Sequence, residues 1–129
     1  MLQDPLNDMM VSIKNAEHAG KSEVVLKPAS KLTGRVLNVM QEHGYIPEFE
    51  FLPDSRGGRF RVKLRGNIND CGVIKPRFSV RRTELETMEA RYLPAQDFGV
   101  LILTTTQGVI SQLRAKEIGV GGKLIAYVY

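Results

Sequence analysis

The densest group of hydrogen-bonding side chains is the segment Thr104-Thr105-Thr106-Gln107-Gly108. It follows an apolar run, Val100 to Leu103, that predicts a buried strand, and it precedes a segment typical of a short helix. Threonine hydroxyls donate and accept hydrogen bonds, and Gly108 lets a second backbone come close. This chemistry suits an RNA minor groove, which offers 2′-hydroxyls and base edges. The alternative is a strand end with a helix cap, because threonine favours strands.

A second segment that can contact a ligand is Gly119-Val120-Gly121-Gly122-Lys123. Its glycines leave a ligand's backbone unobstructed, and Lys123 can neutralise a phosphate. A Walker-type phosphate loop needs serine or threonine after the lysine and a helix after the loop. Here Leu124 follows Lys123 and begins a predicted strand, so a nucleotide-binding loop is excluded. A flexible turn and a contact for RNA phosphates both remain open.

The remaining reactive residues do not form a catalytic constellation. Ser111 has no nearby histidine, and no nucleophile elbow or dinucleotide fingerprint is present. Cys71 is the only cysteine, which excludes an internal disulfide or a cysteine-rich zinc site and favours a buried, inert thiol. His18 and His43 lie far apart in the sequence, without metal-ligand spacing. We therefore expect no enzyme activity, no cofactor and no metal.

The first part of the chain predicts a helix, a strand and a second helix. Asp4 before a proline is typical of an N-cap, and Gly20 can end that helix. Residues 22–26 predict a short strand. Ser30 can cap the next helix, and Gly44 suits the position after its end.

A β-hairpin is expected next, because apolar and charged residues alternate on both sides of a turn at 53–58. The residues expected to point inward are Phe49, Phe51, Phe60, Val62 and Leu64. The outward rows are acidic on the first strand, at Glu48 and Glu50, and basic on the second, at Arg59, Arg61, Lys63 and Arg65. Cross-strand ion pairs and direct contact with RNA are both compatible with these rows.

A break near residues 66–72 indicates a boundary between two lobes. Beyond it we expect a helix over residues 83–92, a strand over 100–103 and a short helix from Ser111 to Gly119. Residues 124–129 are apolar on both faces, which predicts a central strand. The expected fold is α+β, with one lobe at 1–66 and a second at 67–129.

Composition agrees with a small RNA-binding protein. The chain has 129 residues, 43% of them hydrophobic, which suffices for a core. The net charge of +4 and a pI of about 9.4 suit an RNA partner. No run approaches the roughly 18 apolar residues of a membrane span, and the start lacks a basic region followed by an apolar one. We expect a cytoplasmic protein.

Several further motifs occur in a familiar order. Near the start these are Asp4-Pro5, Asp8-Met9-Met10, Ile13-Lys14-Asn15-Ala16, Ser30-Lys31-Leu32 and Gly44-Tyr45-Ile46. The second half carries the more specific ones: Tyr92-Leu93-Pro94, Gly99 to Leu103, Thr104 to Val109, and Ala115 through Gly121-Gly122. In these the chain resembles, nearly end to end, the eighth protein of the small ribosomal subunit, a universal family.

The resemblance implies a two-lobed structural protein of the small ribosomal subunit, with an N-terminal α/β lobe at 1–66 and a mainly-β, RNA-binding lobe at 67–129. Its ligand would be the central domain of small-subunit ribosomal RNA (rRNA), and its neighbours other small-subunit proteins. It would act in subunit assembly and translation, with no membrane or small-molecule substrate. The residues predicted to bind rRNA are Thr104, Thr105, Thr106, Gln107, Gly108, Gly121, Gly122, Lys123, Lys14, Asn15, Ser30, Lys31, Arg77 and Arg91.

Two departures from the bacterial pattern indicate the archaeal branch of that family. Three threonines, Thr104 to Thr106, stand where the bacterial pattern has serine-threonine-serine, and Lys123 replaces a glutamate. The segments 75–78 and 126–129 also look archaeal or eukaryotic. Two rival functions remain at this point. One is a small-molecule enzyme that uses the threonine segment, and the other is a non-ribosomal RNA-binding or protein-interaction module.

Overall fold

The structure is a computed structural model that describes residues 4–27, 29–95 and 98–129. The first half of the chain forms two helices and a three-stranded antiparallel sheet in the order β1-β3-β2. Its elements are α1 (Pro5–His18), β1 (Glu23–Leu26), α2 (Lys31–Glu42), β2 (Phe49–Leu52) and β3 (Arg59–Lys63).

Both helices begin and end where the sequence predicts. The Asp4 carboxylate accepts a hydrogen bond from the backbone N–H of Asn7 at 3.1 Å, and so caps α1. The Ser30 hydroxyl accepts one from the N–H of Thr33 at 3.1 Å and caps α2. Gly20 and Gly44 follow the two helices with φ of +73° and +79°, a conformation that glycine adopts without strain.

The second half forms a larger antiparallel sheet in the order β4-β8-β6-β7, with β5 also paired to β8. Its elements are β4 (Cys71–Val73), β5 (Ser79–Val80), a 3₁₀ turn η1 (Arg82–Glu84), α3 (Leu85–Tyr92), β6 (Val100–Thr105), β7 (Gly108–Ser111), α4 (Gln112–Ile118) and β8 (Gly122–Val128). The expected central position of the last strand is confirmed. Strands β4, β5 and β7 were not predicted, and the α+β fold class is confirmed.

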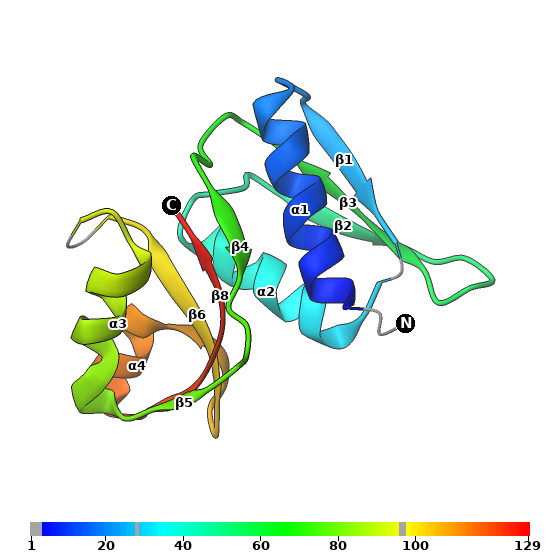
Figure 1. Cartoon of the computed structure of the whole chain (residues 1–129). Coiled ribbons are helices and arrows are strands. Elements are labelled where there is room, and N and C mark those ends of the chain that lie inside the picture. The colour runs from blue at the N-terminus through cyan, green and yellow to red at the C-terminus, as the bar shows by residue number, and fades with distance from the viewer. Residues whose placement is uncertain (1–3, 28, 96–97) are drawn as a thin grey trace.

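The larger sheet separates two apolar cores. Val100, Ile102 and Val128 pack with the buried residues of α1 and α2. Leu101, Leu103 and other residues pack with α3 and α4. Figure 1 shows this arrangement, with α1 and α2 on one side of β4, β8 and β6, and with α3 and α4 on the other. Successive residues of β6 thus face opposite cores, so both faces of the strand are buried. This explains why β6 is apolar at every position up to Leu103.

The first core extends across the expected lobe boundary at residues 66 and 67. It includes Ile68 and Cys71 as well as residues of β6 and β8, together with Met10 and Val36 of the helices. The Cys71 thiol donates a hydrogen bond to the carbonyl of Met10 at 3.5 Å. A division into lobes 1–66 and 67–129 therefore stays a prediction, and any such lobes share one core.

The β2–β3 hairpin forms as expected, but Phe49 is only half-buried and Phe51 is exposed. Phe51 pairs with Phe60 across the strands, yet 53% of Phe51 is exposed, whereas Phe60 is buried. The Phe51 ring lies over Gly58 in the turn and borders an open groove beside α2. The alternating sequence pattern predicts a buried Phe51, but β2 is an edge strand, and this position leaves the side chain exposed.

Candidate nucleic-acid interface

The threonine segment is the tip of a hairpin. β6 ends at Thr105, which pairs with Gly108 at the start of β7. The Thr105 hydroxyl donates to the Gly108 carbonyl at 3.0 Å and accepts the Gln107 N–H at 2.9 Å. Gly108 has φ of +101°, which the turn requires. The segment therefore joins two strands, and the unpredicted strand β7 lies between it and the expected short helix, which Ser111 caps.

The two outer threonine hydroxyls are available to a ligand. Thr106 and Gln107 are exposed at the tip, and Thr104 is half-buried. Within the described residues, neither the Thr104 nor the Thr106 hydroxyl makes a hydrogen bond. The hairpin therefore presents two free hydroxyls and an amide, with Thr105 holding the turn together.

The glycine-lysine segment lies directly beside this hairpin. Thr104 of β6 pairs with Lys123 of β8, and Lys123 pairs on its other side with Ser79 of β5. Residues directly opposite one another in antiparallel strands project on the same face. A hydroxyl, an ammonium and a second hydroxyl thus form a row across three strands. We call Thr104, Lys123 and Ser79 the hydroxyl-lysine row.

Gly121 and Gly122 have an internal role that the sequence did not indicate. A Cβ on Gly121 would lie 2.4 Å from the Val80 carbonyl oxygen, and one on Gly122 would lie 2.3 Å from that of Thr104. The chain itself therefore needs glycine at both positions. The hypothesis that these glycines also admit an RNA backbone stays a prediction.

Two arginines that were not predicted as site residues also lie here. Arg81 and Arg82 are exposed and follow β5. A Cβ on Gly119 would be 3.4 Å from a terminal guanidinium nitrogen of Arg82, so this side chain lies against the glycine loop. Neither arginine forms an ion pair with any residue that the structure describes. In the sequence, the only sign of their role is that two arginines are adjacent. Their place beside the glycine loop depends on β5, which is too short to be recognised from the sequence.

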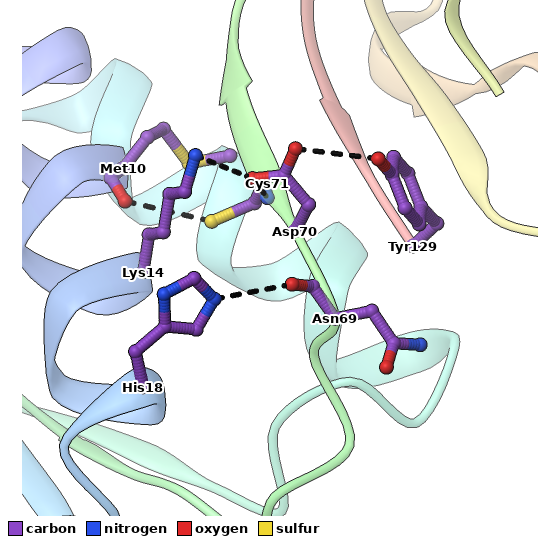
Figure 2. Close-up of polar contacts among 7 residues, drawn as sticks. All are labelled: Met10, Lys14, His18, Asn69, Asp70, Cys71 and Tyr129. Carbon is purple, nitrogen blue, oxygen red and sulfur yellow. Dashed lines mark hydrogen bonds and ion pairs between the residues drawn. The ribbon is translucent and has the colours of Figure 1, made fainter. Parts of the chain in front are cut away.

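Lys14 forms an intramolecular ion pair at the surface, far from the hydroxyl-lysine row. Its ammonium lies 2.9 Å from one carboxylate oxygen of Asp70, and the other oxygen accepts a hydrogen bond from the Tyr129 hydroxyl at 3.3 Å (Figure 2). Hydrogen bonding to Asp70 raises the pKa of Lys14. Tyr129 lies six residues beyond Lys123, or about 20 Å along an extended strand. Lys14 and Asn15 of α1 therefore form no single patch with the hairpin.

The remaining predicted residues are distributed over other elements. Ser30 caps α2, and its neighbour Lys31 is exposed on the first turn. Arg77 is exposed between β4 and β5. Arg91, on the last turn of α3, lies 5.6 Å from the centre of the Tyr92 ring. The structure thus joins the hairpin with the glycine-lysine segment, whereas these cations belong to other elements.

The basic row of the β2–β3 hairpin is partly compensated. Arg61 forms an ion pair with Glu50, and Lys63 with Glu23 at 3.0 Å. The interpretation as ion pairs across the hairpin is therefore confirmed for Arg61, whereas Lys63 pairs with a residue of β1 that was not expected. Arg59 and Arg65 form no ion pair with other described residues.

Cys71 is buried as expected, and burial raises the pKa of its thiol to about 12. The thiol is thus protonated at neutral pH and a poor metal ligand. In the described part of the chain, no cluster of three or more histidine, cysteine or acidic residues can hold a metal. None of the described helices is long and apolar enough to cross a membrane.

Comparison with known proteins shows similarity over the whole chain. Residues 4–129 match the family described as Ribosomal protein S8. A Thermoplasma acidophilum protein named small ribosomal subunit protein uS8 is 58% identical over 129 residues, the full length of both chains. Proteins of that name from Picrophilus torridus and Archaeoglobus fulgidus are 57% and 56% identical, also at full length. All three sources are archaea, in agreement with the branch expected from the sequence.

Proposed function

The chain belongs to the ribosomal protein S8 family, and on this premise we propose that it is a structural, non-catalytic constituent of the small ribosomal subunit. Its ligand is the central domain of small-subunit rRNA, and its other partners are neighbouring small-subunit proteins. It acts in subunit assembly and translation, in the cytoplasm.

The observation that carries the RNA-binding proposal is the juxtaposition of the hairpin tip with the hydroxyl-lysine row. Thr104 and Thr106 offer free hydroxyls, and Lys123 places a positive charge on the strand beside Thr104. A wide, shallow RNA minor groove displays 2′-hydroxyls and base edges that such groups bond. The hydroxyls of Thr104 and Thr106 thus recognise 2′-hydroxyls and base edges, while the Lys123 ammonium adds affinity.

Cations around this surface hold the RNA backbone. Arg81 and Arg82 lie beside the glycine loop and join Lys123 in neutralising phosphates. Lys31, Arg77 and Arg91 extend the positive surface to other elements. Such contacts raise affinity in a salt-dependent way but carry little sequence information.

The decisive experiment is a titration of the protein with a fragment of the rRNA central domain. A perfect duplex of equal length serves as the control, at fixed near-physiological salt. We expect much tighter binding to the fragment. Equal, strongly salt-dependent binding to both RNAs would mean that the protein recognises only the charge of the RNA phosphates. That outcome would contradict this proposal.

Two substitutions locate the interface. Thr106→Val keeps the branched shape but removes the free hydroxyl, so affinity for the fragment falls by roughly fivefold, the value of one net hydrogen bond. Thr87→Val, at an exposed position on α3, is the matched control and leaves the affinity unchanged. Equal affinities of the two variants would contradict the role of the hairpin tip.

A further inference from the structure

A groove of about 650 Å³ lies between α2, the β2–β3 hairpin and β7. Phe49, Phe51 and Phe60 provide its apolar lining, and Lys31, Arg35 and Asn38 of α2 provide polar groups. We call it the phenylalanine groove. Its volume falls in the roughly 300–1,000 Å³ range of small-ligand sites.

The floor of the groove is aromatic. Phe60 makes edge-to-face contacts with Phe49 and Phe51, with ring centres 5.8 and 5.9 Å apart. Gly34 lies over Phe60, since a Cβ there would be 3.0 Å from its ring. Glycine inside a helix weakens the helix, and here it lets the backbone of α2 pack closely on the buried Phe60 ring. With 53% of Phe51 exposed, its ring is accessible to a stacking partner.

The charged residues of the groove are all positive. Lys31 and Arg35 are exposed, and neither forms an ion pair with any described residue. No acidic side chain is among the described residues that line the groove. Asn38 donates its amide N–H to Glu42 at 3.1 Å, which leaves its carbonyl oxygen as an acceptor. The groove thus combines aromatic rings, positive charge and one hydrogen-bond acceptor.

The groove is continuous with the hairpin that we assign to RNA. Val109 of β7 lines it and lies two residues beyond Gln107 at the hairpin tip. An RNA strand bound at the tip therefore passes close to the groove mouth. Val109 also borders a second depression, but that one contains Glu42 and Glu117, whose carboxylates oppose an RNA phosphate.

We propose that the phenylalanine groove receives an unstacked nucleotide of the bound RNA. The base stacks on Phe51, and its phosphate lies between Lys31 and Arg35. Proteins commonly bind splayed-out RNA bases on aromatic side chains beside cations. The inference rests on the proposed function, because the RNA must first be bound. An acidic peptide with an apolar side chain is the competing occupant, and the test separates the two.

Two substitutions of Phe51 test stacking. Phe51→Tyr keeps the aromatic face, and affinity for the central-domain fragment stays as in the wild type. Phe51→Leu keeps apolar area without an aromatic face, and affinity falls by roughly tenfold, within the range of one base–aromatic stack. Phe98→Leu, with 47% of Phe98 exposed outside the groove, is the matched control and has no effect. Thermal unfolding of each variant verifies that it folds.

Charge is tested separately. Lys31→Gln lowers affinity and reduces the slope of log K against log salt by about 0.7 to 0.9, the loss of one phosphate contact. Lys21→Gln removes an exposed lysine outside the groove and leaves the slope unchanged. Equal slopes for both variants would contradict a phosphate at Lys31.

Photo-crosslinking of fragment RNA that carries 4-thiouridine gives a direct readout. We expect crosslinks in residues 49–51 or 34–38. If the wild type prefers the fragment over the duplex but Phe51→Leu binds equally and crosslinks avoid these residues, the groove is not an RNA site. That result overturns this inference, leaves the proposed function intact and favours the acidic peptide. If the wild type shows no preference, both fail together.

Discussion

Three consecutive threonines span the end of β6 and the turn after it, yet their hydroxyls have different environments. That of Thr105 makes two hydrogen bonds within the turn, to Gly108 and from Gln107. Those of Thr104 and Thr106 make none within the described residues. The middle threonine is therefore a structural residue of the hairpin, and its neighbours are the candidates for contact with RNA.

Valine substitutions should separate these two roles. Thr105→Val removes both turn hydrogen bonds, so the free energy of unfolding falls by about 1 to 2 kcal/mol. Thr106→Val removes no intramolecular bond of the described chain, and its stability stays within about 0.5 kcal/mol of the wild type. Urea denaturation measures both. An unchanged free energy of unfolding for Thr105→Val would show that the turn does not depend on the Thr105 hydroxyl.

Asp4 should make stability depend on acidity. The hydrogen bond from Lys75, at 2.8 Å, lowers the pKa of Asp4 against the opposing effect of burial. Because the pKa of Asp4 is lower in the folded than in the unfolded chain, its ionised carboxylate stabilises the fold at pH values above the unfolded pKa near 4. This stabilisation is lost as the pH falls through the lowered pKa of the folded state. Asn at this position still caps α1 but carries no charge.

The matching experiment is urea denaturation of the wild type and Asp4→Asn between pH 6 and 2. We expect the wild type to be more stable at pH 6 and the difference to disappear at the acid end. A difference that stays constant over this range would mean that the charge of Asp4 contributes nothing.

At the scale of elements, the start of α2 has both a structural and a proposed binding role. The Ser30 hydroxyl accepts the Thr33 N–H, and the Thr33 hydroxyl accepts the Ser30 N–H at 3.1 Å. This reciprocal pair fixes the first turn, which carries Lys31 at the mouth of the groove. Ser30 therefore stabilises α2 and also positions Lys31, the residue that we propose to contact the RNA.

Ser30→Asp and Ser30→Ala should separate these roles. Aspartate caps a helix as well as serine, so stability is retained, but its negative charge opposes phosphate and lowers RNA affinity. Alanine removes the cap, which costs about 1 kcal/mol. Thermal unfolding and RNA titration of both variants provide the measurements. An unchanged RNA affinity for Ser30→Asp would show that Ser30 and its surroundings do not lie in the RNA interface.

The sequence predicted those elements whose signals are local. Caps at Asp4 and Ser30 and the apolar run before Thr104 each depend on neighbouring residues only. Strands β4 and β5 have three and two residues, too few for an alternating pattern, and β7, Gly108-Val109-Ile110-Ser111, shows no alternation. Ser79 becomes part of the row only because β5 pairs with β8, and Phe51 is exposed because of its place at the edge. Such positions depend on tertiary pairing, which no local pattern encodes.

At the scale of the whole molecule, the two halves of the chain share buried surface. Cys71, Ile102 and Val128 complete the core that α1 and α2 begin. A fragment of residues 1–66 leaves much of that core exposed to water. Small domains tolerate little such loss, because the net stability of a fold is a small difference between large terms.

We therefore expect residues 1–66 to be unfolded on their own and the full chain to unfold in one transition. Far-ultraviolet circular dichroism of the fragment and coincident urea curves from circular dichroism and tyrosine fluorescence of the full chain test this. A cooperatively folded fragment would show that the boundary near residue 66 separates independent folding units.

The position of β8 has a consequence for how the protein is made. β4 and β6 do not pair with each other, and each pairs instead with β8, whose residues are synthesised after both. During translation the larger sheet cannot close until residues 122–128 have left the ribosomal tunnel. A chain that stops short of them lacks the strand that joins the two cores. Such a product exposes apolar surface on both sides, which marks it for degradation before it can enter assembly.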